Sequence, residues 1–175
     1  MTDTQPYDCT FDVMKHRRDV EYWMRDFADM LTGRASVHDA SKLEPEEKPV
    51  FDEYTPKLKA VEFGSPEYKA ALAAMGEGLR RHYARNSHHP EHYPNGVNGM
   101  TLYDLIEMVC DWIAAATAKG KPIDLNYLTQ RFGIAPQLVS IIVNTLRDID
   151  FEASLHGLPV PFFTPEDYRQ KANIS

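Results

Sequence analysis

Most histidines of this 175-residue chain fall in its first 92 positions, where they could hold metal ions together with nearby aspartates. Six of the seven histidines lie between residues 16 and 92, and one of them forms a His-Asp dipeptide. Neutral imidazole and carboxylate are the ligands that hold zinc, iron, manganese and similar ions. The candidate ligands follow the order His16, His38, Asp39, His82, His88, His89 and Asp111. A lone His-Asp pair often occurs by chance, so the ordered set as a whole predicts the metal centre.

Helices are the elements that must position these residues. Apolar residues at three- and four-residue spacing predict a helix over about 11–31, ended by Gly33, with His16 on its apolar face. Further helical segments are predicted at 35–43, 44–58, 65–85, 101–120, 124–132 and 136–151, and residues 88–99 form an ordered loop. Ser65-Pro66-Glu67 marks one helix start, and Thr101 with Asp104 resembles a capping box.

No run alternates between apolar and polar residues as a half-buried strand does, so we expect little or no sheet. The prediction is an all-α bundle of six to eight helices, in one domain covering residues 1–175. Its core should span about 11–155, with peripheral tails at 1–10 and 158–175.

Composition limits the classes of function. A formal net charge of -7 argues against a protein that binds nucleic acid or an anionic membrane broadly, although a small phosphorylated ligand is still allowed. Two cysteines cannot form a dense disulfide scaffold, which indicates a reducing compartment. The N-terminal segment lacks the basic and apolar regions of a signal peptide, and no apolar run has the length of a membrane span. We therefore expect a soluble, cytoplasmic protein.

The order of the candidate ligands resembles the HD superfamily of metal-dependent phosphohydrolases. Those helical proteins place a His on an early helix, an adjacent His-Asp on the next and an Asp on a later one, which correspond to His16, His38-Asp39 and Asp111. The two-metal branch, which includes the HD-GYP phosphodiesterases, adds a middle His and a His-His pair, matching His82 and His88-His89. The run from His38 to Lys42 also looks like that branch's His-Asp-x-Gly-Lys, with Ser41 replacing the glycine.

The chain is also similar to a family of short phage and bacterial proteins of unassigned activity. The shared segments are His-Asp-x-Ser-Lys, Asn-x-His-His-Pro-Glu-His and Glu-Met-x-Cys-Asp-Trp, which together cover most of residues 11–118. This likeness supplies no reaction.

The HD resemblance implies two divalent ions bridged by Asp39. One ion would take His16, His38 and Asp111, and the other His82 with one or both of His88 and His89. Iron, manganese, cobalt, zinc and magnesium all stay open. The implied reaction is hydrolysis of a phosphoester or phosphoanhydride in a small molecule, with a nucleotide preferred, through a metal-activated water. Lys42, one turn beyond His38, is the predicted catalytic partner that holds a phosphate oxygen or stabilises leaving-group charge.

Several residues are predicted to act around the ligands. Arg34 and Arg81 are candidates for contacting phosphate, and His92 for a supporting or substrate-binding role. Glu107 could orient a ligand histidine. Asp104 is expected to act mainly as a cap at its helix N-terminus.

Several alternatives stay open or are weighed here. Some HD-fold proteins hold two irons with the same ligand set and oxidise carbon with dioxygen, and Lys42 is less clearly needed in such an enzyme. A non-catalytic binding module with a structural metal is the other alternative, and a homo-oligomer is also open. Residues 125–146 have the rhythm of a helix-turn-helix, but the second helix carries only Arg147 as a base, so two packed structural helices are favoured.

Overall fold

The first helix, α1 (Thr10–Val37), continues through the glycine that the sequence pattern predicted as its end. A glycine inside a helix costs only about 1 kcal/mol relative to alanine, and the good helix formers Arg34 and Ala35 follow it. The predicted end at Gly33 is therefore wrong. The expected short helix over 35–43 is wrong for the same reason, because residues 35–37 belong to α1 and only Ala40–Leu43 form a separate 3-10 helix, η1.

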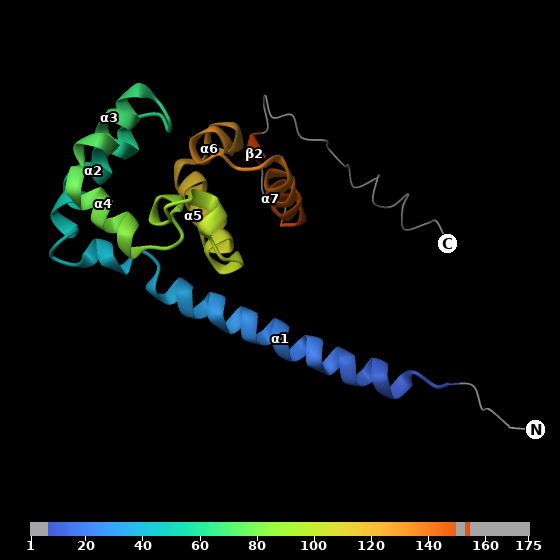
Figure 1. The fold of residues 1–175 in the computed structure, drawn as a ribbon. Coiled ribbons are helices and arrows are strands. Elements are labelled where there is room, and N and C mark those ends of the chain that lie inside the picture. The colour runs from blue at the N-terminus through green and yellow to red at the C-terminus, as the bar shows by residue number, and fades with distance from the viewer. Residues whose placement is uncertain (1–6, 150–152, 155–175) are drawn as a thin grey trace, which may run out of the picture. The chain divides into compact units, whose positions relative to one another are not determined.

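The computed structural model describes residues 7–149 and the backbone of residues 153–154. It divides into two compact units, Met1–His38 and Asp39–Ser175, and α1 is the element described in the first unit. Figure 1 shows α1 as one long continuous helix. That residues 1–175 form one domain stays a prediction, and the tail predicted at 158–175 lies outside the described residues.

The second unit is almost entirely helical. After η1 it contains α2 (Lys48–Ala60), α3 (Pro66–Ala74), α4 (Gly76–Arg85), η2 (Pro90–His92), η3 (Gly96–Gly99), α5 (Leu102–Lys119), β1 (Ile123–Asp124), α6 (Leu125–Phe132), α7 (Pro136–Asp148) and β2 (Ala153–Ser154). The sheet in the described part of the chain is one parallel pairing of the two-residue strands β1 and β2. The predicted all-α fold class is confirmed.

Local signals account for several helix ends. The Ser65 side chain accepts from the backbone N–H of Tyr68 and caps α3, as its sequence predicts. The predicted helix over 65–85 is, however, divided into α3 and α4 between Ala74 and Gly76. Gly76 has a φ of +54°, a conformation that interrupts a helix and that glycine adopts at no steric cost. The capping box of Thr101 and Asp104 at the start of α5 is confirmed.

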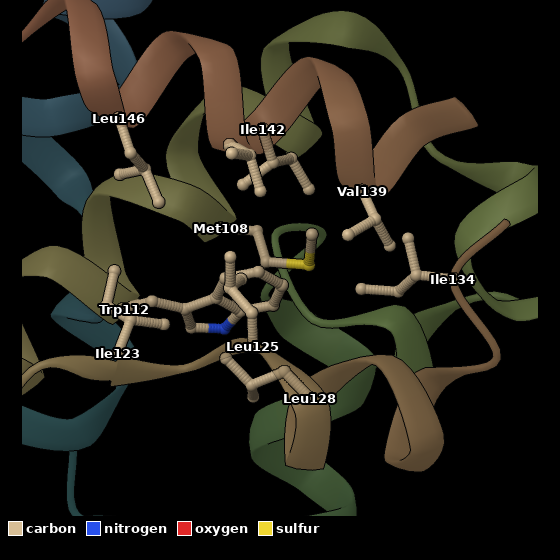
Figure 2. Close-up of a cluster of buried hydrophobic side chains, with 10 residues drawn as sticks. Met108, Trp112, Ile123, Leu125, Leu128, Ile134, Val139, Ile142 and Leu146 are labelled. Carbon is tan, nitrogen blue, oxygen red and sulfur yellow. The ribbon is translucent and has the colours of Figure 1, made fainter. Parts of the chain in front are cut away.

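A hydrophobic core joins α5, α6, α7 and β1. Figure 2 shows Met108 and Trp112 of α5 facing Val139, Ile142 and Leu146 of α7. Ten buried residues form this cluster: Met108, Trp112, Ile123, Leu125, Leu128, Ile134, Val139, Ile142, Val143 and Leu146. The helices α6 and α7 thus both pack into this core, and the interpretation of residues 125–146 as purely structural helices stays a prediction.

The core fixes the orientation of α5, which also carries three acidic residues of the predicted site. Met108 and Trp112 lie one turn apart and point into the core. Glu107 and Asp111 each precede one of them by one residue, so they project about 100° away on the helix surface. Among the residues that the structure describes, no helix combines the length and apolar character needed to cross a membrane.

Candidate metal centre

Four side chains of the second unit bring potential ligand atoms together. Asp39, His82, His88 and His89 each offer one atom, and the four atoms lie within 4.8 Å of one another. Asp39 Oδ1 lies 3.3 Å from His82 Nε2 and 3.6 Å from His88 Nε2. His82 Nε2 lies 2.9 Å from His89 Nε2. These residues, called the four-ligand cluster below, are separated by up to 50 positions in the chain.

Asp39 enters the cluster from an unusual backbone conformation. It is the N-cap of η1 and has a φ of +56°, the one positive φ among the described residues that are not glycine. Aspartate tolerates the left-handed region better than most residues do. The turn is closed by a hydrogen bond from the Lys42 N–H to the Asp39 carbonyl, 2.9 Å long. Such conformations often occur at functional sites, where other contacts hold them.

The histidines come from the end of α4 and from the loop that follows. His82 lies in the last turn of α4, and its side chain is 1% exposed. Asn86 ends the helix with an extended backbone, as the sequence predicted, and turns the chain toward His88 and His89. His88 is also buried, at 2% exposed, and its ring centroid lies 4.1 Å from that of His89.

Asp104 anchors this loop to α5. Its carboxylate accepts hydrogen bonds from Thr101, from the Ser87 hydroxyl at 2.7 Å and from the Tyr93 hydroxyl at 2.8 Å. Burial raises the pKa of Asp104, but these hydrogen bonds outweigh it and lower the pKa below its ordinary value. Asp104 is thus a cap, as expected, and it also holds the residue that precedes His88.

Carboxylates contact the remote nitrogens of two histidines. His82 Nδ1 lies 3.0 Å from Glu47 Oε2, and His88 Nδ1 lies 3.1 Å from Glu107 Oε1. Asp39 Oδ1 faces the Nε2 atoms at 3.3 and 3.6 Å, but the carboxylate contacts at Nδ1 are shorter, so each imidazole in its neutral form carries its proton on Nδ1. The Nε2 lone pairs of His82 and His88 then point toward Asp39 Oδ1. Glu107 occupies the place that an orienting residue would take.

The four-ligand cluster fits a divalent cation. Without a cation, two imidazole lone pairs would face one carboxylate oxygen, which is electrostatically unfavourable. Bonds of about 2.0–2.2 Å to nitrogen and oxygen give ligand-to-ligand edges of about 2.8–3.1 Å in an octahedral site and about 3.3–3.6 Å in a tetrahedral site. The spacings of 2.9, 3.3 and 3.6 Å in the cluster are close to these edges. Carboxylate-backed imidazoles are also the usual surroundings of a metal site.

The other predicted ligands, Asp111, His16 and His38, do not belong to the four-ligand cluster. Asp111 offers a ligand atom within 4.8 Å of one from Asp39, on α5 one turn beyond Glu107. His16 lies on α1, and His38 is the last residue of the first unit, directly before Asp39 in the chain. The structure therefore brings together the predicted ligands of one ion, whereas the set for the other ion stays a prediction.

Lys42 lies beside the cluster. Its ammonium contacts Asp39 Oδ2, the oxygen that does not face the histidines, and lies 4.9 Å from the centre of the Phe51 ring. The Lys42 side chain is 33% exposed, so a solvent-borne group can reach it.

Three other predicted residues lie in different surroundings. Arg81 is exposed on α4, and Arg34 is in the last turn of α1. His92 donates from Nδ1 to the Tyr83 carbonyl, 3.0 Å away, and so ties η2 to α4. The clusters of potential ligands among the described residues do not include His92. Their predicted substrate contacts stay predictions.

The sequence analysis missed several neighbours of the cluster. Glu47 is fully buried beside His82, and Ser41 and Asn86 join it there. The Tyr83 ring lies 4.9 Å from that of His89, and Arg131 donates to its hydroxyl. Burial, with a smaller contribution from Glu91, raises the pKa of Tyr83 to about 12. No sequence signal separates Glu47 from its exposed neighbour Glu46, because only packing decides which acid is buried.

A family comparison covers all of the candidate ligands. The model of a family described as "Family of unknown function (DUF5662)" matches residues 5–148. The chain belongs to this family. No curated protein and no solved structure matches it. DUF5662 membership brings no activity with it, so the function must be argued from the site.

Acid should destabilise the metal-free protein as the pH falls below about 6.5, the ordinary pKa of histidine. Burial is the main cause that lowers the pKa of His82 and of His89 below 6.5. Below that pH the unfolded chain binds protons that these folded histidines do not, so the free energy of unfolding falls as pH falls. The slope should approach about 1.4 kcal/mol per pH unit for each histidine that stays neutral. Urea unfolding with chelator at pH 7.5 and 5.5 measures it.

The control for this prediction is His82→Phe. Its free energy of unfolding should depend less steeply on pH, because the contribution of one histidine to the slope is removed. Equal unfolding free energies for the wild-type protein at the two pH values would contradict the prediction.

Proposed function

We propose that this chain is a metal-dependent phosphohydrolase that acts on a small phosphorylated molecule, with a nucleotide the preferred class, in the cytoplasm. The supporting observation is the convergence of Asp39 Oδ1 with the Nε2 atoms of His82, His88 and His89, two of which have a carboxylate at the other ring nitrogen. The resemblance to the HD superfamily supports the reaction class by analogy.

The residues would divide the work as follows. Asp39, His82, His88 and His89 hold a divalent cation, and Asp111 with the predicted His16 and His38 would complete a second position. A bound cation lowers the pKa of a water that it holds and polarises a phosphoryl oxygen. Glu107 orients His88, because its carboxylate contacts the ring nitrogen that faces away from the cluster.

Lys42 supplies a positive charge at the edge of the site. A phosphate group carries negative charge that increases on the leaving oxygen as the bond breaks. A preorganised ammonium near Asp39 stabilises that charge and holds the substrate in a protein whose net charge is -7.

Elemental analysis followed by a phosphate-release screen tests the proposal. The purified protein should contain a divalent metal and release phosphate from some member of a panel of nucleoside mono-, di- and triphosphates and cyclic nucleotides. The reaction should proceed in the absence of dioxygen when manganese or cobalt is supplied as the metal. Iron with an oxygen-dependent absorbance change and no phosphate release would favour the oxygenase. Metal without turnover, whose removal unfolds the protein, would favour the binding module.

A further inference from the structure

We propose that Glu47 is a positioning residue for His82, which it holds in the tautomer that can bind a metal. This inference rests on the proposed function and deepens it. Glu47 is not one of the proposed metal ligands; it contacts the ring nitrogen of the ligand His82 that faces away from the cluster.

Glu47 is a carboxylate in a place that normally excludes charge. Its side chain is 0% exposed, and burying an ionised carboxylate costs several kcal/mol unless hydrogen bonds and a countercharge compensate. Arg85 approaches Glu47 Oε1 at 3.8 Å, and it is itself held by Glu44 at 2.5 and 2.9 Å. Arg85, on the same helix as His82, thus offsets part of the buried charge, while the hydrogen bonds that hold the carboxylate are at Oε2.

One assignment of the hydrogen bonds around Glu47 uses the shortest contacts, and in it Asn86 Nδ2, which also lies 3.0 Å from His82 Nδ1, donates elsewhere. The Asn86 amide donates to Ser41 Oγ at 2.8 Å and to the His82 carbonyl at 2.8 Å. Because Ser41 Oγ accepts there, its own proton goes to Glu47 Oε2, 2.7 Å away. Glu47 Oε2 can only accept, so the 3.0 Å contact with His82 places the imidazole proton on Nδ1.

Because the proton of the imidazole is on Nδ1, the other ring nitrogen of His82, Nε2, carries a lone pair. That atom is the one that lies 3.3 Å from Asp39 Oδ1 and 2.9 Å from His89 Nε2. Without Glu47, the opposite tautomer would place a proton on Nε2, where Asp39 would accept it. Glu47 therefore keeps the metal-binding atom of His82 open and makes it a stronger donor.

Ser41 is part of the same arrangement. The superfamily pattern that the His38–Lys42 run resembles has glycine at this position. In this chain the Ser41 hydroxyl is buried between Glu47 and Asn86. A glycine at position 41 would remove the hydrogen bonds that the serine hydroxyl makes with Glu47 and with Asn86. Ser41 therefore helps to stabilise the buried carboxylate of Glu47.

Cobalt binding tests the role of Glu47. The affinity of the full chain for Co²⁺ is measured at 10 °C by absorbance in competition with a chelator. Glu47→Gln should weaken binding about 10-fold and Glu47→Leu about 100-fold, the range expected when a partner of a ligand histidine is lost. Glu46→Gln is the matched control, because it removes the neighbouring exposed charge, and its affinity should equal that of the wild type.

A nitrogen-15 NMR measurement of the metal-free protein reports the tautomer directly. His82 should carry its proton on Nδ1 in the wild type and on Nε2 in Glu47→Leu. Thermal unfolding shows whether each variant is folded, and Glu47→Gln, which keeps the size of the side chain, still tests the role if Glu47→Leu does not fold.

The outcomes separate the two claims. A wild-type His82 protonated on Nε2 would overturn the role of Glu47. So would a Glu47→Gln variant that melts at a lower temperature but binds Co²⁺ as tightly as the wild type, because its role would then be structural only. In that second case, loss of Co²⁺ binding in His82→Ala would leave the proposed function standing. A wild-type protein that binds no Co²⁺ would overturn both.

Discussion

Replacement of Asp39 by asparagine should abolish turnover and weaken metal binding more than about 100-fold, which exceeds the usual effect of losing a residue behind a ligand. Asp39 Oδ1 faces both His82 and His88, so it is the shared point of the cluster. Asparagine keeps the size of the side chain and tolerates the positive φ of +56° that the turn requires. Helix content, measured by circular dichroism, should therefore be unchanged.

Asp52→Asn is the control for this variant. Asp52 is an exposed residue of α2 that pairs with Lys48, and its loss removes the same charge away from the cluster. It should keep the metal content and the turnover of the wild type. An Asp39→Asn protein with the metal stoichiometry of the wild type would show that Asp39 is not a ligand.

Replacement of Lys42 by alanine should preserve metal binding but reduce turnover by about 100-fold or more, as the loss of one preorganised charge contact can. The ammonium contacts Asp39 Oδ2 and not the oxygen that faces the histidines, so its removal leaves the four ligand atoms in place. The measurement is kcat for phosphate release, at equal metal content, on the substrate that the screen identifies.

Lys48→Ala provides the comparison for Lys42→Ala. Lys48 is an exposed lysine of α2 whose partner is Asp52, and its loss should leave kcat unchanged. If Lys42→Ala turns over as fast as the wild type, Lys42 only neutralises Asp39. A Lys42→Ala protein that loses its metal would also contradict the prediction, because Lys42 would then be needed to hold the ligand Asp39.

Local signals in the sequence predicted the parts of the fold that depend on neighbouring residues. Thr101 and Asp104 identify the start of α5 because the two hydrogen bonds of a capping box join residues only three apart. The helix end predicted at Gly33 is wrong because a glycine ends a helix only when its backbone turns left-handed, and the residues around it decide whether it does. The backbone of Gly76 does turn left-handed, although no local pattern predicts a helix end there.

The ligand histidines could be proposed from residue types and order, whereas their surroundings could not. Asp39 and His88 are 49 positions apart, and their approach depends on how η1, α4 and the following loop pack. Glu107 could be suggested because it shares a helix with Asp111. Glu47 could not, since burial separates it from Glu44 and Glu46, and His92 contacts a backbone carbonyl that no residue type reveals.

The most direct test of the account is a crystal structure of the protein loaded with Mn²⁺ or Zn²⁺, with anomalous diffraction recorded at the absorption edge of the metal. We expect an anomalous peak about 2.0–2.2 Å from Asp39 Oδ1 and from the Nε2 atoms of His82, His88 and His89. Electron density should also place Glu47 and Glu107 at the Nδ1 atoms of His82 and His88. No peak among these four residues, at a metal concentration that saturates binding in solution, would contradict the proposed metal centre.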